Sequence, residues 1–260
     1  MGKNTSLKAG FLKIVGLGPS GEEWICPPAL QAIKEAQVIC GYKTYIKLIA
    51  RLLQPGQEVV QTGMTKERER CQRAIEIALS GKRVALVCSG DPGIYALSGL
   101  VFEILKKMGV TNSRLQVEVI PGIPALSACS ALLGAPLIHD FAVISLSDLL
   151  TPWDLIEERI EAASKADFVI VFYNPRSKKR RDHLPRALDI IAKHRKGDTP
   201  VGIATKAMRQ GQELYITSLA EICKKGPDHW NIGMQSLLIV GNRQTFVWNG
   251  KMITPRGYEI

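Results

Sequence analysis

The segment with the most distinctive chemistry reads Ser-Gly-Asp-Pro-Gly and spans residues 89–93. It directly follows an apolar run at 84–88 that is typical of a buried strand, and α/β proteins bind ligands at such strand ends. The glycines let a ligand approach the backbone, and the Asp91 carboxylate can accept hydrogen bonds from hydroxyl groups or pair with a positive group. The alternative is that Asp91 caps the following helix, and the sequence leaves both roles open.

A second glycine-rich loop, Gly-Leu-Gly-Pro-Ser-Gly at residues 16–21, formally matches the G-x-G-x-x-G dinucleotide fingerprint. Two features argue against a nicotinamide site. The first good helix start, Pro28, comes too late to place a helix N-terminus on a pyrophosphate, and the next strand ends near Cys40 without an acid for the ribose. We therefore expect either a tight turn that needs the positive φ of glycine or the floor of a different ligand site.

A cluster of cations follows a predicted strand at 168–172 and an Asn-Pro turn, where we expect a helix to begin. It consists of Arg176, Lys178, Lys179, Arg180 and Arg181. Cations near a helix N-terminus oppose the helix dipole, so the arrangement is unfavourable unless an anion or an exposed loop offsets it. The cluster indicates either an anion site or a solvated basic loop.

Several side chains that can donate or accept protons surround a short predicted strand at 141–145. His139 and Asp140 precede this strand, and Ser145, Asp148 and Thr151 end or follow it. No nucleophile signature such as G-x-S-x-G surrounds the serines, and Asp148 or Thr151 could instead cap the next helix. His139 can serve acid–base chemistry, although a single histidine is more often structural.

The elements that must position these residues follow from the hydrophobic pattern. Apolar runs rich in β-branched residues alternate with stretches of helical periodicity, which predicts an α/β architecture with substantially parallel strands. Strands are predicted at 11–15, 59–61, 84–88, 116–120, 141–145, 168–172, 201–204 and 236–240, and helices at 28–36, 66–80, 95–108, 125–133, 153–166 and 181–194. The Pro-Gly-Ile-Pro segment at 121–124 predicts a division into α/β domains 1–122 and 123–260, with a cleft between them.

Composition places the chain among globular proteins. At 260 residues, 46% hydrophobic and 22% charged, it can build a sizeable core. The longest apolar run, at 168–173, is far below the roughly 20 residues that span a bilayer, and the N-terminus lacks a signal pattern, so we expect a cytoplasmic protein without a membrane partner. The six cysteines occur singly and without metal-ligand spacing, so we expect reduced, mostly buried thiols and no protein-bound metal.

The charge balance says more about partners. The 34 Lys and Arg residues exceed the 24 Asp and Glu residues, and the net charge of +10 attracts anions. A nucleic acid is one candidate, and a polycarboxylate or phosphate small molecule is another. Aromatic residues make up only 6% and do not interleave with the basic cluster, which disfavours a nucleic-acid-binding protein.

Together the motifs resemble the tetrapyrrole methylase family over essentially the whole chain. The segments at 16–19, 89–95 and 121–125 are similar to motifs found across that family. The segments at 134–141, 144–148, 151–153, 172–177 and 254–258 resemble the branch that methylates carbon 17 of precorrin-3B or cobalt-factor III in cobalamin biosynthesis.

This resemblance implies two α/β domains, a homodimer, and S-adenosylmethionine held in a cleft between the domains, with S-adenosylhomocysteine as product. The implied cofactor neighbours are Pro19, Gly90, Asp91, Ile94, Tyr95, Pro124, Ala125, Asn174, Ala207, Gln235 and Ser236. Members of the family usually carry Ser or Thr where this chain has Pro124, which removes a hydroxyl group and a backbone donor.

The implied chemistry has two parts. The sulfonium methyl group is already activated, so its transfer needs mainly in-line positioning, which contributes as much as roughly 7–11 kcal/mol in well-oriented systems. Ring contraction moves carbon–carbon bonds and closes a lactone, which requires proton transfers. The candidates for that work are His139, Asp140, Ser145, Asp148 and Arg176.

The basic cluster suits a macrocycle that bears many carboxylates, and any cobalt is expected to arrive inside that substrate. Whether the substrate carries cobalt is left open. The alternatives are a tetrapyrrole methylase that acts at another carbon and a basic nucleic-acid-binding protein, which would bind DNA or RNA with steep salt dependence.

Overall fold

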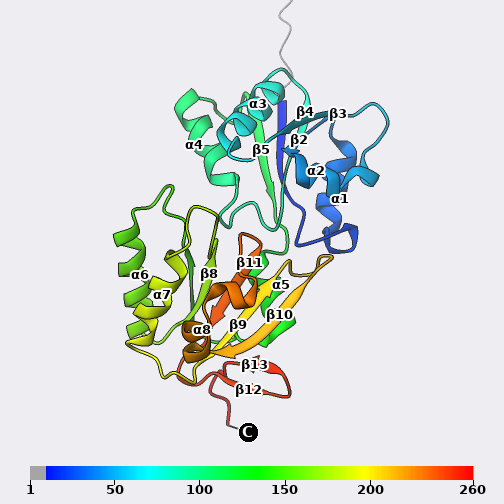
Figure 1. Cartoon of the computed structure of the whole chain (residues 1–260). Coiled ribbons are helices and arrows are strands. Elements are labelled where there is room, and N and C mark those ends of the chain that lie inside the picture. The colour runs from blue at the N-terminus through cyan, green and yellow to red at the C-terminus, as the bar shows by residue number, and fades with distance from the viewer. Residues whose placement is uncertain (1–9, 260) are drawn as a thin grey trace, which may run out of the picture. The chain divides into compact units, whose positions relative to one another are not determined.

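The computed structural model describes residues 10–259, and the chain forms two compact units, Met1–Ala125 and Leu126–Ile260 (Figure 1). Each unit has its own sheet and its own buried core. That the chain divides after residue 122 into two independent domains stays a prediction.

The first unit contains a fully parallel sheet in the order β3-β2-β4-β1-β5. Its strands are β1 (Gly10–Gly16), β2 (Val38–Tyr42), β3 (Glu58–Thr62), β4 (Arg83–Cys88) and β5 (Leu115–Ile120). The central strands are nearly continuous apolar runs because helices cover both faces of a parallel sheet. Val15 stands opposite both Val87 and Ile120, so β1, β4 and β5 end at the same edge.

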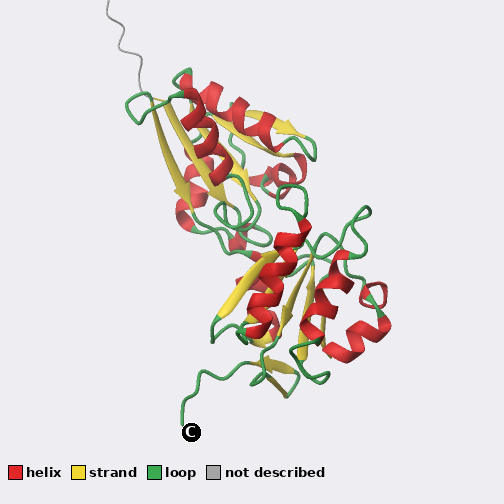
Figure 2. Ribbon diagram, turned by 90° about the vertical axis from the view of Figure 1, so that its left-hand side faces the viewer, coloured by secondary structure: helices red, strands yellow, loops and turns green. Residues whose placement is uncertain are grey.

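Helices pack on both faces of this sheet (Figures 1 and 2). Alternate side chains of each strand point to opposite faces. Val15 and Val87 point to the face covered by α1 (Pro27–Glu35) and α2 (Lys43–Leu48). Ile14 and Leu86 point to the opposite face, which α3 (Glu67–Leu79) and α4 (Ser98–Met108) cover. This period of two is the expected geometry of a strand buried on both sides.

The second unit departs from the prediction of substantially parallel strands. Its sheet has the order β10-β9-β11-β8-β7, built from β7 (Phe141–Ser145), β8 (Val169–Tyr173), β9 (Pro200–Thr205), β10 (Glu213–Ser218) and β11 (Ser236–Val240). Only β7 and β8 pair in parallel, and the other three pairs are antiparallel. The prediction was wrong here because the partly exposed edge strand β10 was missed, and it forms a hairpin with β9.

Two layers cover the faces of this second sheet. One face packs against α6 (Trp153–Lys165), α7 (His183–Ala192) and α8 (Leu219–Lys225), and Figure 1 shows α6 and α7 beside β8. The other face meets α5 (Ala125–Leu133) and a small sheet of β6 (Gly134–Ala135), β12 (Phe246–Trp248) and β13 (Lys251–Ile253). A Cβ at Gly202 would lie 2.7 Å from Cδ1 of Leu133, so only glycine allows this close approach without repacking.

Short 3₁₀ segments complete the chain at Glu22–Trp24, Ala50–Leu52 and Pro227–Trp230. The predicted helices at 95–108 and 181–194 begin later than expected, at Ser98 and His183. Across residues 10–259, the helices are all too short or too polar to cross a membrane.

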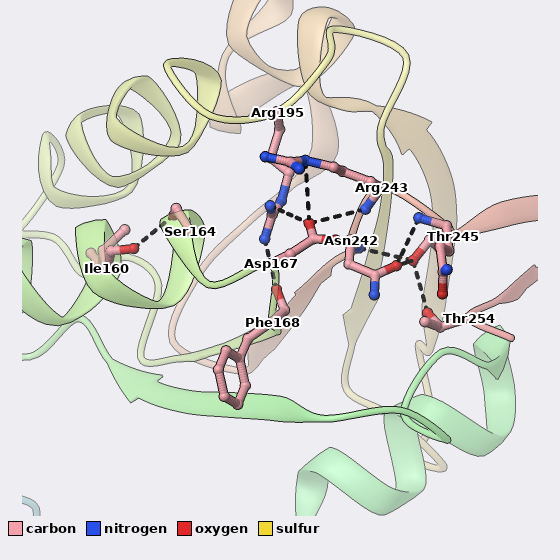
Figure 3. A network of polar contacts seen from close by, with 10 residues as sticks. Ile160, Ser164, Asp167, Phe168, Arg195, Asn242, Arg243, Thr245 and Thr254 are labelled. Atoms are coloured by element: carbon pink, nitrogen blue, oxygen red, sulfur yellow. Dashed lines mark hydrogen bonds and ion pairs between the residues drawn. The ribbon is translucent and has the colours of Figure 1, made fainter. Parts of the chain in front are cut away.

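A polar network fixes the edge of the second unit where β8 begins and β11 ends (Figure 3). Arg195 is buried, forms an ion pair with Asp167 and donates to the carbonyl of Phe168 at 3.0 Å. Burial lowers the pKa of Arg195. The backbone N–H of Arg243 also donates to the carboxylate of Asp167, at 3.2 Å. The network therefore ties three segments together at the edge opposite Asn174 and Gln235.

All six cysteines are free thiols, and four of them are buried. Burial raises the pKa of Cys40, Cys88 and Cys129 to about 12 and that of Cys71 to about 11. The remaining two, Cys26 and Cys223, are partly or fully exposed. Within the described part of the chain, no group of three or more His, Cys, Asp and Glu side chains is placed to hold a metal ion.

Candidate functional site

Three glycine-containing loops cross at the edge of the first unit where β1, β4 and β5 end. Gly18 and Gly90 form a two-way backbone bridge, with N–H to O distances of 3.2 and 2.8 Å. A Cβ at Gly16 would lie 2.6 Å from the nitrogen of Gly122, and one at Gly122 would lie 2.3 Å from the oxygen of Gly90. Glycine is therefore required at 16 and 122 because backbone atoms of neighbouring loops occupy the space of a side chain.

Asp91 connects two of these loops. Its Oδ1 accepts a hydrogen bond from the N–H of Gly93 at 2.7 Å, and its Oδ2 accepts one from the N–H of Gly122 at 3.1 Å. Helix α4 begins at Ser98 with Leu97 as its N-cap, so the helix-capping role considered for Asp91 is wrong. Each carboxylate oxygen has a second acceptor position, so the group can still bind a hydroxyl or an ammonium group.

The other residues implied as cofactor neighbours in this unit lie in the same loops. Pro19 is buried in the loop after β1, and the N–H of Ile94 donates to the carbonyl of Asp91 at 3.4 Å. Tyr95 has a φ of +50°, is 55% exposed and lies before α4 rather than inside it. The backbone of Pro124 and Ala125 passes close to Gly90. A Cβ atom on Gly90 would lie 3.8 Å from Cα of Pro124 and 3.9 Å from the nitrogen of Ala125.

The second unit gathers its predicted residues at the edge where β7, β8 and β9 end and the antiparallel β11 begins. Asn174 has a φ of +51°, and its Nδ2 donates to Oγ of Ser145 at 2.9 Å. The loop that holds Ala207 is joined to the start of β11 by a hydrogen bond of 3.0 Å from the N–H of Lys206 to the carbonyl of Gln235. Five separate predictions therefore fall along one edge of one sheet, at Ser145, Asn174, Ala207, Gln235 and Ser236.

The side chain of Ser236 has partners inside the unit. Its Oγ lies 2.7 Å from Oγ1 of Thr205 and accepts from the N–H of Gly233 at 3.0 Å. The residue is only 6% exposed. Any contact that Ser236 makes with a ligand is therefore expected to use its backbone.

Arg180 is a buried connector rather than part of a solvated basic loop. Its Nη1 donates to the carbonyl oxygens of Leu146 at 3.0 Å and Asn174 at 3.3 Å, and its Nη2 lies 3.7 Å from Sδ of Met234. The residue is 8% exposed. One guanidinium group thus holds the loop after β7, the loop after β8 and the loop before β11 in fixed positions.

Asp148 pairs with a histidine that the sequence analysis did not single out. Its Oδ2 lies 3.0 Å from Nε2 of His183, and this pairing lowers the pKa of Asp148. The ring of Trp153 meets that of His183 edge to face, with centroids 4.3 Å apart. Helix α6 has Pro152 as its N-cap, so the capping roles considered for Asp148 and Thr151 are wrong. The only sequence signal for His183 is its position two residues after the basic cluster.

Arg176 forms a bidentate pair with Asp228. Nη1 lies 2.5 Å from Oδ1 and Nη2 lies 2.9 Å from Oδ2. The pairing raises the pKa of Arg176 and lowers that of Asp228. Both residues line a hollow of about 400 Å³ together with Ser177, Lys178, Arg181, Ile232, Gly233 and Met234.

The five candidates for proton transfer do not form one cluster. Ser145 is the last residue of β7, and Asp148 and Arg176 follow the ends of β7 and β8, whereas His139 and Asp140 precede the start of β7. The five residues of β7 separate the two groups by about 16 Å at roughly 3.3 Å per residue. Nδ1 of His139 accepts from the N–H of Asp140 at 2.7 Å. The histidine that lies beside Asp148 is His183, and not His139.

Sequence comparison links the chain to one family. The sequence model of the Tetrapyrrole (Corrin/Porphyrin) Methylases matches residues 12–223. A protein of Salmonella typhimurium named "Probable cobalt-factor III C(17)-methyltransferase" is 47% identical over 250 residues, which cover 96% of this chain and 100% of that protein. The "Cobalt-factor III methyltransferase" of Priestia megaterium is also 47% identical, and this chain spans 45% of its length.

Structure comparison gives a consistent result. The crystal structure of the methyltransferase CobJ superimposes with a TM-score of 0.86 at 32% identity, covering 95% of this chain and 100% of that chain. The uroporphyrin-III C-methyl transferase of Thermus thermophilus, solved in complex with S-adenosylhomocysteine, superimposes with a TM-score of 0.67 at 22% identity, covering 89% and 92%. This second likeness concerns the fold alone.

Proposed function

The chain belongs to the tetrapyrrole methylase family, and from this premise we propose that it transfers a methyl group from S-adenosylmethionine to carbon 17 of a precorrin-type macrocycle, with ring contraction, in cobalamin biosynthesis. The observation that carries the proposal is the 47% identity with the Salmonella typhimurium protein over that protein's whole length. The CobJ structure supports it, because the likeness there also extends over 95% of this chain.

The loops of the first unit fit S-adenosylmethionine. The Asp91 carboxylate retains acceptor positions for ribose hydroxyls or for the ammonium group of the cofactor. When bound, the cofactor supplies an electrophilic methyl group on sulfur. The task of the chain is then to hold the sulfonium and the acceptor carbon in line, which needs rigid loops rather than a nucleophile.

The substrate that we propose is cobalt-factor III. Both curated relatives described above carry cobalt-factor III in their names. Such a macrocycle bears several carboxylates, which complement the net charge of +10 and the cations of the basic loop. The cobalt belongs to the substrate and enters the site with it.

For the proton transfers of ring contraction we propose Ser145 and Asp148, with His183 as the partner of Asp148, and we propose Arg176 as a cation that binds the substrate. These residues lie at the edge that also holds Asn174. A group that transfers protons must lie within hydrogen-bond reach of the reacting atoms, so a role for His139 and Asp140 requires the macrocycle to reach the opposite end of β7.

The experiment combines binding with product analysis. Calorimetric titration with S-adenosylmethionine and S-adenosylhomocysteine is expected to give binding of both. Addition of cobalt-factor III is expected to yield a product with one added methyl group and a contracted ring by mass and absorption spectra, in preference to precorrin-3B. Failure to bind either cofactor form would contradict the proposal, and methylation at another carbon would assign the chain to another branch of the family.

We also propose a cytoplasmic homodimer, which the resemblance to the family implies. Light scattering on the purified full chain is expected to give twice the chain mass of 28.6 kDa. A mass equal to one chain across the micromolar range would contradict the dimer without affecting the proposed reaction.

A further inference from the structure

The pair between Arg176 and Asp228 is unequal in its surroundings. The side chain of Arg176 is only 14% exposed, whereas that of Asp228 is 87% exposed. The two hydrogen bonds of 2.5 and 2.9 Å align the planar guanidinium with the carboxylate, which is the geometry by which arginine recognises carboxylates in general. The arginine is thus held in the wall of the hollow, and its partner projects into solvent.

Asp228 is not needed to hold its own turn in place. The turn Pro227–Trp230 is closed by a hydrogen bond of 3.2 Å from the N–H of Ile232 to the carbonyl of Pro227. Trp230 is buried in the core of the second unit, and Nδ2 of Asn231 donates to Glu213 at 3.0 Å. Because the Asp228 side chain is 87% exposed, water solvates its carboxylate when it leaves Arg176, and another carboxylate can take the same two hydrogen bonds at small energetic cost.

The hollow around this pair is suited to an anionic side arm. Its volume of about 400 Å³ lies within the range of small-molecule sites. Its wall carries the cations of Arg176, Lys178 and Arg181 and one acidic residue, Asp228, so positive charge is in excess. Met234, which also lines the hollow, is fixed by Arg180, and Arg180 also holds the carbonyl of Asn174. The hollow therefore adjoins the loops that carry the predicted cofactor residues of this unit.

We propose that Asp228 is an internal competitor for a substrate carboxylate: a carboxylate of the macrocycle displaces Asp228 and takes the guanidinium fork of Arg176. The exchange breaks and forms hydrogen bonds and ion pairs only. It rests on the proposed function in one respect, namely that the substrate is a polycarboxylate tetrapyrrole. Arg176 is in this view a substrate-binding residue, and Asp228 sets the affinity of its fork.

The test measures binding of uroporphyrin, a tetrapyrrole with eight carboxylates, to the full chain by absorbance titration. Asp228→Asn is expected to tighten binding by about 2- to 5-fold, the order of the weak ion pairs that an exposed carboxylate forms. Arg176→Lys keeps the charge but loses the fork, and is expected to weaken binding by about 10-fold. In the double variant the gain from Asp228→Asn is expected to disappear.

The matched control is Asp198→Asn. Asp198 is an exposed carboxylate of the same unit, and it lies just before the start of β9, at the other end of that strand from Ala207. Its variant changes the net charge by the same amount as Asp228→Asn, so it reports the general electrostatic attraction of an anion. An equal gain in both variants would overturn the proposal, and so would unchanged or weaker binding by Asp228→Asn with an unchanged melting temperature.

Calorimetry with S-adenosylmethionine separates this inference from the proposed function. Asp228→Asn is expected to bind the cofactor as the unchanged chain does, and to lower the KM for cobalt-factor III with little change in kcat. If the chain bound no S-adenosylmethionine, the methyltransferase proposal would fail, while the uroporphyrin titrations would still decide whether Asp228 competes for the fork.

Discussion

Replacing Asp91 with alanine tests the hydrogen bonds by which this residue connects two loops of the first unit. The variant removes two hydrogen bonds to a charged acceptor, at 2.7 Å from Gly93 and 3.1 Å from Gly122. Such bonds contribute about 1.5–3 kcal/mol each in shielded surroundings, and Asp91 is only partly buried. We therefore expect Asp91→Ala to lower the free energy of unfolding by about 2–3 kcal/mol. At about 2–4 °C per kcal/mol for a chain of this size, the melting temperature falls by roughly 4–12 °C.

Asp91→Asn divides the effect into its parts. The amide keeps one acceptor oxygen, but its NH₂ group then faces the N–H of either Gly93 or Gly122, so one bond is lost and two donors oppose each other. We expect a loss of about 1–2 kcal/mol in stability. Both variants also lose the charge that we assign to cofactor binding, so affinity for S-adenosylmethionine is expected to fall by about 10- to 100-fold.

The assays are urea unfolding of the full chain and calorimetric titration with S-adenosylmethionine. Glu103→Ala is the matched control, because Glu103 is an exposed carboxylate on α4 in the same unit and its loss is expected to change stability by less than about 0.5 kcal/mol. The reasoning is refuted if Asp91→Ala unfolds at the same urea concentration as the unchanged chain. If Asp91→Ala kept its stability but lost affinity for S-adenosylmethionine, Asp91 would serve only to bind the cofactor and not to hold the loops together.

Three further outcomes are expected. Arg180→Met leaves two loop carbonyls without their buried donor and is expected to lower the free energy of unfolding by about 2–4 kcal/mol in urea. Lys179 is its exposed neighbour, and Lys179→Met is expected to change stability hardly at all. Equal effects of the two variants would contradict the role of Arg180 as a connector of loops. A carboxylate whose pKa is lowered by folding stabilises the fold at pH values above its ordinary pKa of 3.8, and this contribution is lost as the pH falls through the folded pKa. Asp148→Asn is therefore expected to have a lower free energy of unfolding than the unchanged chain at pH 7 and the same value near pH 2. A difference in stability that does not depend on pH would argue against the pair of Asp148 and His183. A thiol reagent at pH 8 is expected to modify Cys26 and Cys223 in the folded protein and all six cysteines in urea. Rapid modification of more than two cysteines in the folded protein would contradict the burial of the other four.

Local pattern was sufficient for most of the elements. The apolar run at 236–240 forms β11 with the predicted bounds, the run at 84–88 forms β4, which begins one residue earlier at Arg83, and the helix predicted at 125–133 is α5. The two strands are buried on both faces, so nearly every residue in them is apolar. Strand β10 was missed because it is an edge strand that is mostly only partly buried, and its Glu-Leu-Tyr-Ile-Thr-Ser sequence is only weakly apolar.

The sequence by itself determined the composition of the loops, namely two glycine loops with an aspartate, a basic segment, and small residues after a Pro-Gly turn. The likeness to the family also follows from the sequence alone, because each family motif is a short segment of neighbouring residues. It could not determine which loops meet. The contact of Gly16 with Gly122 joins the end of β1 to the loop after β5, and these two strands are neighbours only in the folded sheet.

The tertiary structure decided the roles of the charged residues. The sequence treated Arg176 and Arg180 alike, but one lines a hollow beside an exposed carboxylate and the other is buried among three loops. It grouped His139 with Asp148 because they are close along the chain, whereas the fold places His183 beside Asp148 and His139 at the far end of β7. The environment of a charge depends on atoms distant in the chain, so only the folded chain assigns each cation and carboxylate its partner.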